Sequence, residues 1–318
     1  MKASMNACML CGSERGTALF RGSDRLYHTT ARQFSVVRCG QCGLLRLDPP
    51  PPPDELPGYY PANYWFEPGE SAAGWLEEAY RRLVLRDHVR FVEGALRATR
   101  ARGPLLDVGC GGGLFLGMMR QRGFPVLGLD ISRDAAAMAW RRQQAPAVCA
   151  RLEEAPFPAA SVAALTMFHV LEHLYDPRAY LRTALELLMP DGRLVVQVPN
   201  ASSWQFRLLG RSWNGVDIPR HLFDFRDRDV EKLLQACGFE VVRRKYFSLR
   251  DNPAGLASSL APSLDPMARR VRRIPESAGA RLLKDLVYFA MVMAAVPPAA
   301  LEAACGAGST VMIEARRP

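Results

Sequence analysis

Residues 105–113 read Leu-Leu-Asp-Val-Gly-Cys-Gly-Gly-Gly, and this stretch decides the fold. Its apolar start predicts a buried strand. Its glycines predict a tight turn in which Gly109, Gly111 and Gly113 let the backbone approach a ligand just before a helix begins. Asp107 lies inside the motif, where turns that bind phosphate seldom carry a carboxylate, so we expect this acid to meet a cation rather than a pyrophosphate.

A second acidic residue ends the next predicted strand. Residues 127–132 read Leu-Gly-Leu-Asp-Ile-Ser, and Asp130 stands where a carboxylate can accept hydrogen bonds from the two hydroxyls of a ribose. The order of strand, acid, glycine turn, helix and second acid favours a nucleoside-binding site. A NAD-binding Rossmann fold and a purely structural turn are the alternatives.

Apolar strands and helices alternate beyond this motif. Strands are expected at 105–108, 126–130, near 148, 162–168, 193–198 and 240–247, and helices at 73–99, 114–122, 133–142, 177–188 and 227–236. Such alternation implies a parallel sheet covered on both faces. A helical stretch over 280–304, broken at Pro297-Pro298, and a strand over 309–315 are expected to close the chain.

These residues resemble the class I S-adenosylmethionine (SAM) dependent methyltransferases, from about residue 102 to residue 247. The resemblance implies a Rossmann-like α/β fold with a seven-stranded sheet and SAM as the cofactor. It implies that Asp107 lies near the methionine ammonium and that Asp130 holds the ribose. The residues expected to contact the cofactor are Asp107, Gly109, Cys110, Gly111, Gly113, Asp130, Ile131, Glu153 and His169.

The sequence departs from that family where adenine is expected to bind. The family often carries an acid just before the segment that matches residues 152–158, where this chain has Ala150-Arg151. It also often opens the fourth strand with an aspartate, where this chain has Ala163-Ala164. We therefore assign adenine recognition to Glu153 and the backbone near it.

Four of the eight cysteines form two pairs, Cys8 with Cys11 and Cys39 with Cys42, each pair separated by two residues. Four thiolates brought together in this way suit a tetrahedral Zn²⁺ in a closed structural site. Two disulfides or unrelated free thiols are the alternatives. The segment also resembles the N-terminal zinc ribbon of several bacterial small-molecule and sugar methyltransferases. The remaining cysteines are expected to be small buried residues: Cys110, Cys149, Cys237 and Cys305.

Methyl transfer to oxygen needs a group that removes the acceptor's proton. His221 is the first candidate for this general base, because it lies in a loop after the fifth strand among aromatic residues that are expected to line the substrate. His169, Glu172 and His173 at the end of the fourth strand are further candidates. For each histidine, a structural hydrogen bond is the competing interpretation.

The net charge of +9 is carried almost wholly by arginine in an arginine-rich composition, which weakens an inference to nucleic acid. The chain also lacks the Asn/Asp-Pro-Pro-Phe/Tyr motif that holds a base amine. The apolar stretch 286–296 is about half the ~20 residues that a membrane span requires. The basic run 269–273 beside residues 282–301 still leaves contact with a membrane surface, or a lipid-linked acceptor, open.

Three parts are expected: a zinc-ribbon module (1–48), a Pro- and Tyr-rich linker (49–72) and a methyltransferase domain (73–318) with a helical insertion at about 252–308. The first thirty residues show no secretory signal pattern, so a reducing cytoplasm is the expected location. The favoured function is SAM-dependent methylation of a small-molecule or saccharide acceptor, at oxygen. The alternatives are an rRNA or tRNA methyltransferase and a non-enzymatic SAM-binding zinc adaptor. The sequence does not indicate the oligomeric state.

Overall fold

The computed structural model describes residues 7–61 and 72–318, and the expected linker therefore lies partly outside the described residues. Two compact units share the chain, and both are discontinuous in sequence. Among the described residues, the first unit contains 7–61, 199–229 and 251–311, and the second contains 72–198, 230–250 and 312–318. Each unit has its own sheet.

The second unit is built on a seven-stranded sheet in the order β10-β11-β8-β7-β4-β5-β6, which confirms the predicted fold class. The strand bounds are β4 Leu105–Val108, β5 Val126–Asp130, β6 Ala147–Cys149, β7 Val162–Phe168, β8 Leu188–Pro199, β10 Glu240–Lys245 and β11 Thr310–Arg316. Strands β8, β7, β4, β5 and β6 pair in parallel, as expected for apolar strands that alternate with helices.

The expectation that the strands pair in parallel is wrong at one edge of the sheet, because β10 and β11 pair antiparallel. Strand β10 has a neighbour on one side only, and three of its four exposed positions carry charged side chains, Glu240, Arg243 and Arg244. An edge strand of this kind needs no apolar run on both faces, so its sequence does not reveal its direction.

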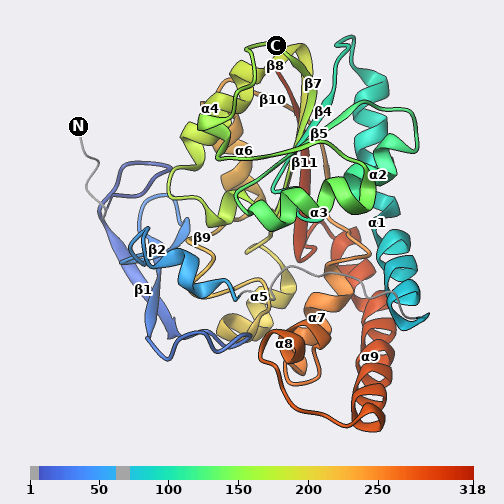
Figure 1. Cartoon of the computed structure of the whole chain (residues 1–318). Coiled ribbons are helices and arrows are strands. Elements are labelled where there is room, and N and C mark those ends of the chain that lie inside the picture. Colours follow the sequence, from blue (N-terminus) through green and yellow to red (C-terminus); the bar gives the residue numbers. More distant parts are fainter. Residues whose placement is uncertain (1–6, 62–71) are drawn as a thin grey trace. The chain divides into compact units, whose positions relative to one another are not determined.

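Helices cover both faces of this sheet (Figure 1). Their bounds are α1 Ala72–Ala98, α2 Leu114–Arg120, α3 Arg133–Gln143, α4 Pro177–Leu187 and α6 Asp227–Ala236. Two of them begin at side-chain caps, in which Ser132 accepts from the amide of Ala135 and Asp176 accepts from that of Ala179. The core between α1, α2 and the sheet includes Val89, Leu116 and Met119, all with little or no exposure.

The first unit contains an antiparallel four-stranded sheet in the order β1-β2-β3-β9. Its strands are β1 Gly16–Gly22, β2 Phe34–Cys39, β3 Leu45–Leu47 and β9 Phe223–Asp224. Strand β9 comes from a distant part of the chain and pairs with β3 through Phe223 and Asp224. The cysteine-containing segment is therefore completed by residues that follow the fifth parallel strand of the other sheet.

The helices of the first unit are α5 Trp204–Leu209, α7 Asn252–Leu260, α8 Pro266–Val271 and α9 Ala278–Ala304. The expected break at Pro297-Pro298 is wrong, because α9 continues through both prolines. Val292, Ala295 and Ala299 are buried on one side of the helix and hold the segments before and after the prolines in line. This packing offsets the two backbone hydrogen bonds that the prolines remove.

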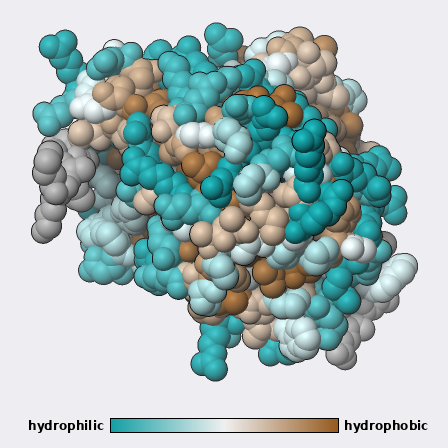
Figure 2. All heavy atoms as spheres, turned by 90° about the horizontal axis from the view of Figure 1, so that it is seen from above, coloured by the Kyte–Doolittle hydropathy of each residue, from teal (hydrophilic) through white to brown (hydrophobic). Residues whose placement is uncertain are grey.

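Helix α9 is longer than the apolar stretch from which the sequence argued against a membrane span. Among the described residues, α9 is long and apolar enough to cross a membrane, by length and composition alone. Most of its apolar stretch is not buried inside the protein. The length argument is therefore wrong. On the face seen from above, hydrophilic and hydrophobic residues are interspersed (Figure 2).

Candidate functional site

The glycine turn between β4 and α2 has the conformation that its sequence predicts. Gly109, Gly111 and Gly113 have φ angles of 75°, 52° and 74°, in the left-handed region where a side chain is strained. The amides of Gly109 and Cys110 both donate to the carbonyl of Leu129 at the end of β5, at 2.7 and 3.1 Å. The turn is thus tied to the strand that carries the second acid.

Close packing also requires glycine in this turn. A Cβ on Gly109 would lie 2.8 Å from Cγ2 of Val170, and one on Gly113 would lie 2.7 Å from Cβ of Ala139. Both distances are below the contact distance of carbon atoms. The backbone therefore leaves no space for side chains between β4, α3 and the segment after β7.

Asp130 faces this turn with both carboxylate oxygens engaged. Its Oδ2 accepts from the amide of Gly111 at 2.9 Å, and its Oδ1 accepts from the amide of Ser132 at 2.8 Å. Each oxygen keeps a further lone pair for a ligand hydroxyl. The next residue, Ile131, is 72% exposed although it is aliphatic. A buried acceptor beside an exposed apolar side chain fits a ligand with a ribose and a flat base.

Asp107 is buried at the end of β4, and its Oδ1 accepts from the hydroxyl of Thr166 at 2.6 Å. Burial raises the pKa of Asp107 to about 7, and the negative charge of Asp130 adds to this effect, while the Thr166 hydrogen bond and Arg250 oppose it. Burial also raises the pKa of Asp130. A positive charge bound beside these two buried carboxyl groups would stabilise their ionised forms and lower both pKa values. The pair is therefore suited to bind a cationic group.

The segment after β7 places His169 and Glu172 together. The Nδ1 of His169 lies 3.2 Å from Oε1 of Glu172, and its Nε2 lies 2.9 Å from Nε2 of Gln197. Because the Gln197 amide nitrogen can only donate, Nε2 of His169 is the acceptor and Nδ1 carries the proton. Residue 169 also has a φ of 57°, and its own amide donates to the carbonyl of Gln197. Hydrogen bonds at both ring nitrogens orient this histidine.

Val170 lies against the glycine turn, so this segment borders the nucleoside site. The amide of His173 donates to the carbonyl of Val170 and closes the short turn there. Glu153 lies in the 3-10 turn η2 Leu152–Glu154 and is exposed. The roles of Glu153 in adenine binding and of His169, Glu172 and His173 in catalysis stay predictions.

His221 belongs to the first unit. Its Nδ1 lies 2.8 Å from the carbonyl of Gly215, so Nδ1 carries the proton in the neutral ring and Nε2 keeps the lone pair. Its amide donates to the carbonyl of Asp217 at 2.8 Å. We expected aromatic residues near His221 to line the substrate. This is wrong for Trp213, Phe223 and Phe225, because their side chains are buried in the core of this unit. The role of His221 as the general base stays a prediction.

Arg220, next to His221, is a residue that sequence reasoning missed. Its guanidinium is fully buried and donates to both oxygens of Asp24 at 2.9 Å, to Oδ1 and Oδ2 of Asp217, and to the carbonyl of Tyr59. Burial alone would raise the pKa of Asp24, but Arg220 lowers it to about 2. The loop that carries His221 is thus anchored to the N-terminal segment through buried charges.

The four paired cysteines converge on one point. Their sulfur atoms all lie within 4.8 Å of one another, with Cys8 and Cys42 at 3.5 Å and Cys11 and Cys39 at 3.6 Å. These distances are too long for disulfides, whose sulfurs lie about 2.05 Å apart. Four sulfurs about 2.3 Å from a tetrahedral Zn²⁺ would lie about 3.8 Å from one another. The cluster therefore fits the ion.

Backbone amides also face these sulfurs. Burial would raise the pKa of Cys39, but hydrogen bonds from the amides of Cys42 and Gln41 and from neighbouring thiols lower it to about 6. Gly12 and Gly43 have φ angles of 74° and 78° and lie in the turns that the two cysteine pairs form.

Of the other cysteines, Cys110 and Cys237 are buried as expected. Cys149 and Cys305 are exposed, so that part of the prediction is wrong.

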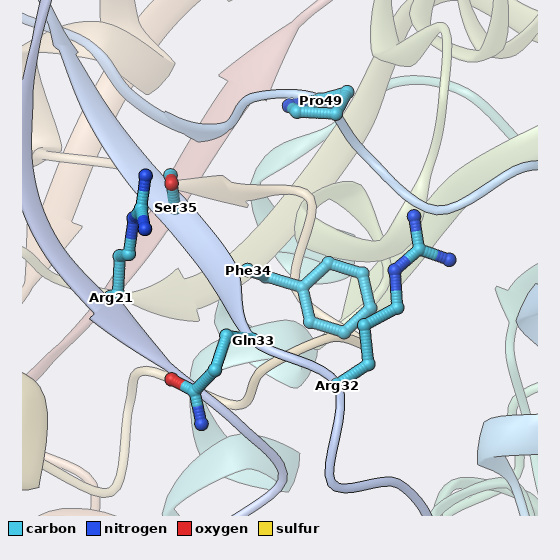
Figure 3. Close-up of a pocket in the computed structure, with 6 residues that line it drawn as sticks. All are labelled: Arg21, Arg32, Gln33, Phe34, Ser35 and Pro49. Atoms are coloured by element: carbon cyan, nitrogen blue, oxygen red, sulfur yellow. The ribbon is translucent and has the colours of Figure 1, made fainter.

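A hollow of about 230 Å³ lies on the sheet of the first unit (Figure 3). It is lined by Arg21, Arg32, Gln33, Phe34, Ser35 and Pro49. The Arg32 guanidinium lies over the Phe34 ring, 5.0 Å from its centre, and pairs with Glu55 at 2.9 Å. Its charge is therefore already compensated, and the hollow contains none of the predicted site residues.

Residues 75–244, more than half of the chain, match a family described as a methyltransferase domain. A probable SAM-dependent methyltransferase of Mycolicibacterium smegmatis is 31% identical over 192 residues, which cover 58% of this chain and 63% of that protein. The chain thus spans less than two thirds of that relative's length. A ubiquinone biosynthesis O-methyltransferase of Pseudomonas aeruginosa is 30% identical over 184 residues, covering 53% of this chain and 77% of that protein.

Among solved structures, a SAM-dependent methyltransferase from Archaeoglobus fulgidus is similar with a TM-score of 0.48 and 17% identity, covering 77% of this chain and 100% of that chain. The family match covers the glycine turn, Asp107 and Asp130. The sequence resemblance is confirmed: this chain belongs to the SAM-dependent methyltransferase family and carries a four-cysteine N-terminal cluster.

Proposed function

We propose that this chain transfers a methyl group from SAM to an oxygen atom of a small-molecule acceptor. The observation that carries the proposal is the pair of hydrogen bonds that fix Asp130 against the glycine turn. Relatives named as O-methyltransferases support oxygen as the accepting atom. A saccharide acceptor, free or lipid-linked, is the finer form of the proposal and rests on the resemblance to sugar methyltransferases with a zinc ribbon.

Each residue of the site has a defined task in this proposal. Asp130 accepts hydrogen bonds from the ribose hydroxyls, Asp107 pairs with the methionine ammonium, and Ile131 covers the base. SAM supplies an electrophilic methyl group on its sulfonium, with sulfur as the leaving group. His221 accepts the proton of the acceptor hydroxyl at Nε2 as the new carbon–oxygen bond forms. His169 is a positioning residue, since hydrogen bonds already hold both of its ring nitrogens.

We also propose that Cys8, Cys11, Cys39 and Cys42 hold one structural Zn²⁺. With four thiolates the ion has no open position, so it neither activates water nor binds the acceptor. Its effect is to fix the turn before β1 and the turn between β2 and β3. Zinc thiolates of this kind persist in a reducing compartment, which supports the cytoplasm as the location of the protein.

Turnover with methyl-labelled SAM tests the function. The purified chain is mixed with labelled SAM and a panel of hydroxylated acceptors that includes phenols and saccharides, and label transfer to acceptor is measured. Asp107→Ala serves as the cofactor-binding control and should transfer nothing. Saturable SAM binding without transfer to any hydroxyl would favour a non-enzymatic adaptor. Salt-sensitive RNA retention with transfer to RNA would favour a nucleic-acid acceptor.

A further inference from the structure

Helix α9 exposes a broad apolar face. The side chains of Leu282, Leu283, Leu286, Val287, Phe289 and Met293 are each 42–64% exposed. Positions 282, 286, 289 and 293 recur every three or four residues, and 283 and 287 lie next to them, so all six lie on one side of the helix. These six residues and Leu301, which is 61% exposed, form a surface that we call the α9 face. It is about 30 Å long at 1.5 Å per residue.

The opposite side of α9 is docked on its own unit. Val292, Ala295 and Ala299 are buried there, and the Tyr288 hydroxyl lies 2.8 Å from the hydroxyl of Ser258 on α7. Near the end of the helix, Glu302 accepts from the Gln205 side chain at 2.9 Å. A soluble surface helix normally places its polar residues outward, and here the arrangement is reversed.

Charges are confined to the ends of α9 and to its neighbour α8. Residues 286–301 contain no charged side chain. Lys284 pairs with Glu276 at 2.7 Å, and Arg269 of the predicted basic run is buried between Glu276 and Asp285. The expectation that the whole run is available to a membrane is therefore wrong for Arg269.

Three arginines lie in the segment before α9 and in the first turn of this helix. In the part of the chain that the structure describes, Arg272, Arg273 and Arg281 make no ion pair, and Arg273 and Arg281 are exposed. Basic side chains beside an exposed apolar helix face are the combination that anionic lipid attracts. Apolar patches of this extent on a protein surface mark contact sites.

A second copy of the chain would not complement this surface. In an antiparallel pair of α9 helices, these arginines would face the C-terminal end of the partner helix, where the acid is Glu302, which is buried against Gln205. In a parallel pair, arginines would face arginines. The headgroups of an anionic membrane supply the missing negative charge, and the acyl chains below them accept the leucine side chains.

We propose that the α9 face docks this chain on an anionic membrane, with α9 lying in the plane of the interface. The docked side of α9 keeps the helix on its unit, so the helix lies on the bilayer and does not cross it. This inference is independent of the proposed function, because lipid binding needs neither SAM nor an acceptor.

Co-sedimentation of the full chain with vesicles tests the proposal. Vesicles of phosphatidylcholine with about one third phosphatidylserine should retain the wild type, and vesicles of phosphatidylcholine alone should retain much less. The double variant Leu286→Glu/Met293→Glu should lose retention. Replacing Arg272, Arg273 and Arg281 by Gln should weaken binding about fivefold per arginine, or roughly 100-fold together.

Val242→Glu is the control, because it also replaces an exposed aliphatic side chain (48% exposed) by a negative charge, at a position in β10 that is not part of the α9 face. It should bind vesicles like the wild type. Melting temperatures of all variants should stay close to that of the wild type, since every replaced side chain is solvent-accessible. Failure of the wild type to bind anionic vesicles, or equal binding by Leu286→Glu/Met293→Glu, would overturn the proposal. A stable dimer in solution that this double variant dissociates would also overturn it, in favour of contact between copies.

Discussion

Replacing Asp107 by asparagine should change how the stability of the protein depends on pH. Asparagine keeps the shape of the side chain and can still accept from the hydroxyl of Thr166, but it carries no charge. In the folded protein the pKa of Asp107 is raised to about 7 from 3.8. This difference corresponds to roughly 4 kcal/mol in favour of the protonated carboxyl.

The direction of the effect follows from proton binding. Between about pH 4 and about pH 7 the folded state holds this proton and the unfolded state has lost it, so the wild type becomes less stable as pH rises. Asp107→Asn lacks this contribution. The free energy of unfolding of the variant, minus that of the wild type, should therefore rise by roughly 3 kcal/mol between about pH 5 and about pH 8.

Urea unfolding without ligand, measured at several pH values for both proteins, gives this difference directly. Burying an amide in place of a carboxyl can change the free energy of unfolding of the variant by the same amount at every pH. The test is therefore how the difference between variant and wild type changes with pH, and not its value at one pH. The SAM affinity of the wild type should also fall about tenfold per pH unit below about 7, because binding the ammonium requires the ionised carboxyl. A pH-independent difference in stability, or one that falls as pH rises, would refute the reasoning.

Three further predictions concern the other parts of the site. Cys39→Ser should release the bound zinc, measured as metal per chain, while Cys305→Ser, at an exposed cysteine outside the cluster, should retain it. Arg220→Ala leaves Asp24 and Asp217 buried without their partner and should lower the free energy of unfolding by about 3–5 kcal/mol, whereas Arg21→Ala at an exposed position should change it little; equal effects would contradict the anchoring role. His221→Ala should slow turnover at least tenfold without changing SAM affinity, and unchanged turnover would remove it as the base.

Local sequence patterns predicted the parts of the fold that depend on neighbouring residues. The strand at 105–108, the glycine turn and Asp130 lie within one continuous stretch, and their conformations follow from apolar runs and from glycine. The convergence of the four cysteines was also predicted, because their spacing is typical of two turns that together could hold a metal ion. The five parallel strands followed from their alternation with helices.

Features made by distant residues could not be predicted in the same way. Strand β9 has two residues, too few for a period, and its pairing with β3 joins segments far apart in the chain. One partner of Arg220 is the distant Asp24, whose surroundings in the sequence carry no signal of an ion pair. The two prolines in α9 carry a strong local signal for a break, and contacts with the rest of the unit override it.

The central claim is that Asp130 and the glycine turn hold SAM, and calorimetric titration of the chain with SAM tests it most directly. The account predicts one SAM per wild-type chain and an affinity about 10- to 100-fold weaker in Asp130→Ala, because a charged acceptor for the ribose hydroxyls is lost. Asp134→Ala, at an exposed acid in the first turn of α3, should bind like the wild type. Absence of saturable binding to the wild type, or equal affinity in Asp130→Ala, would contradict the account.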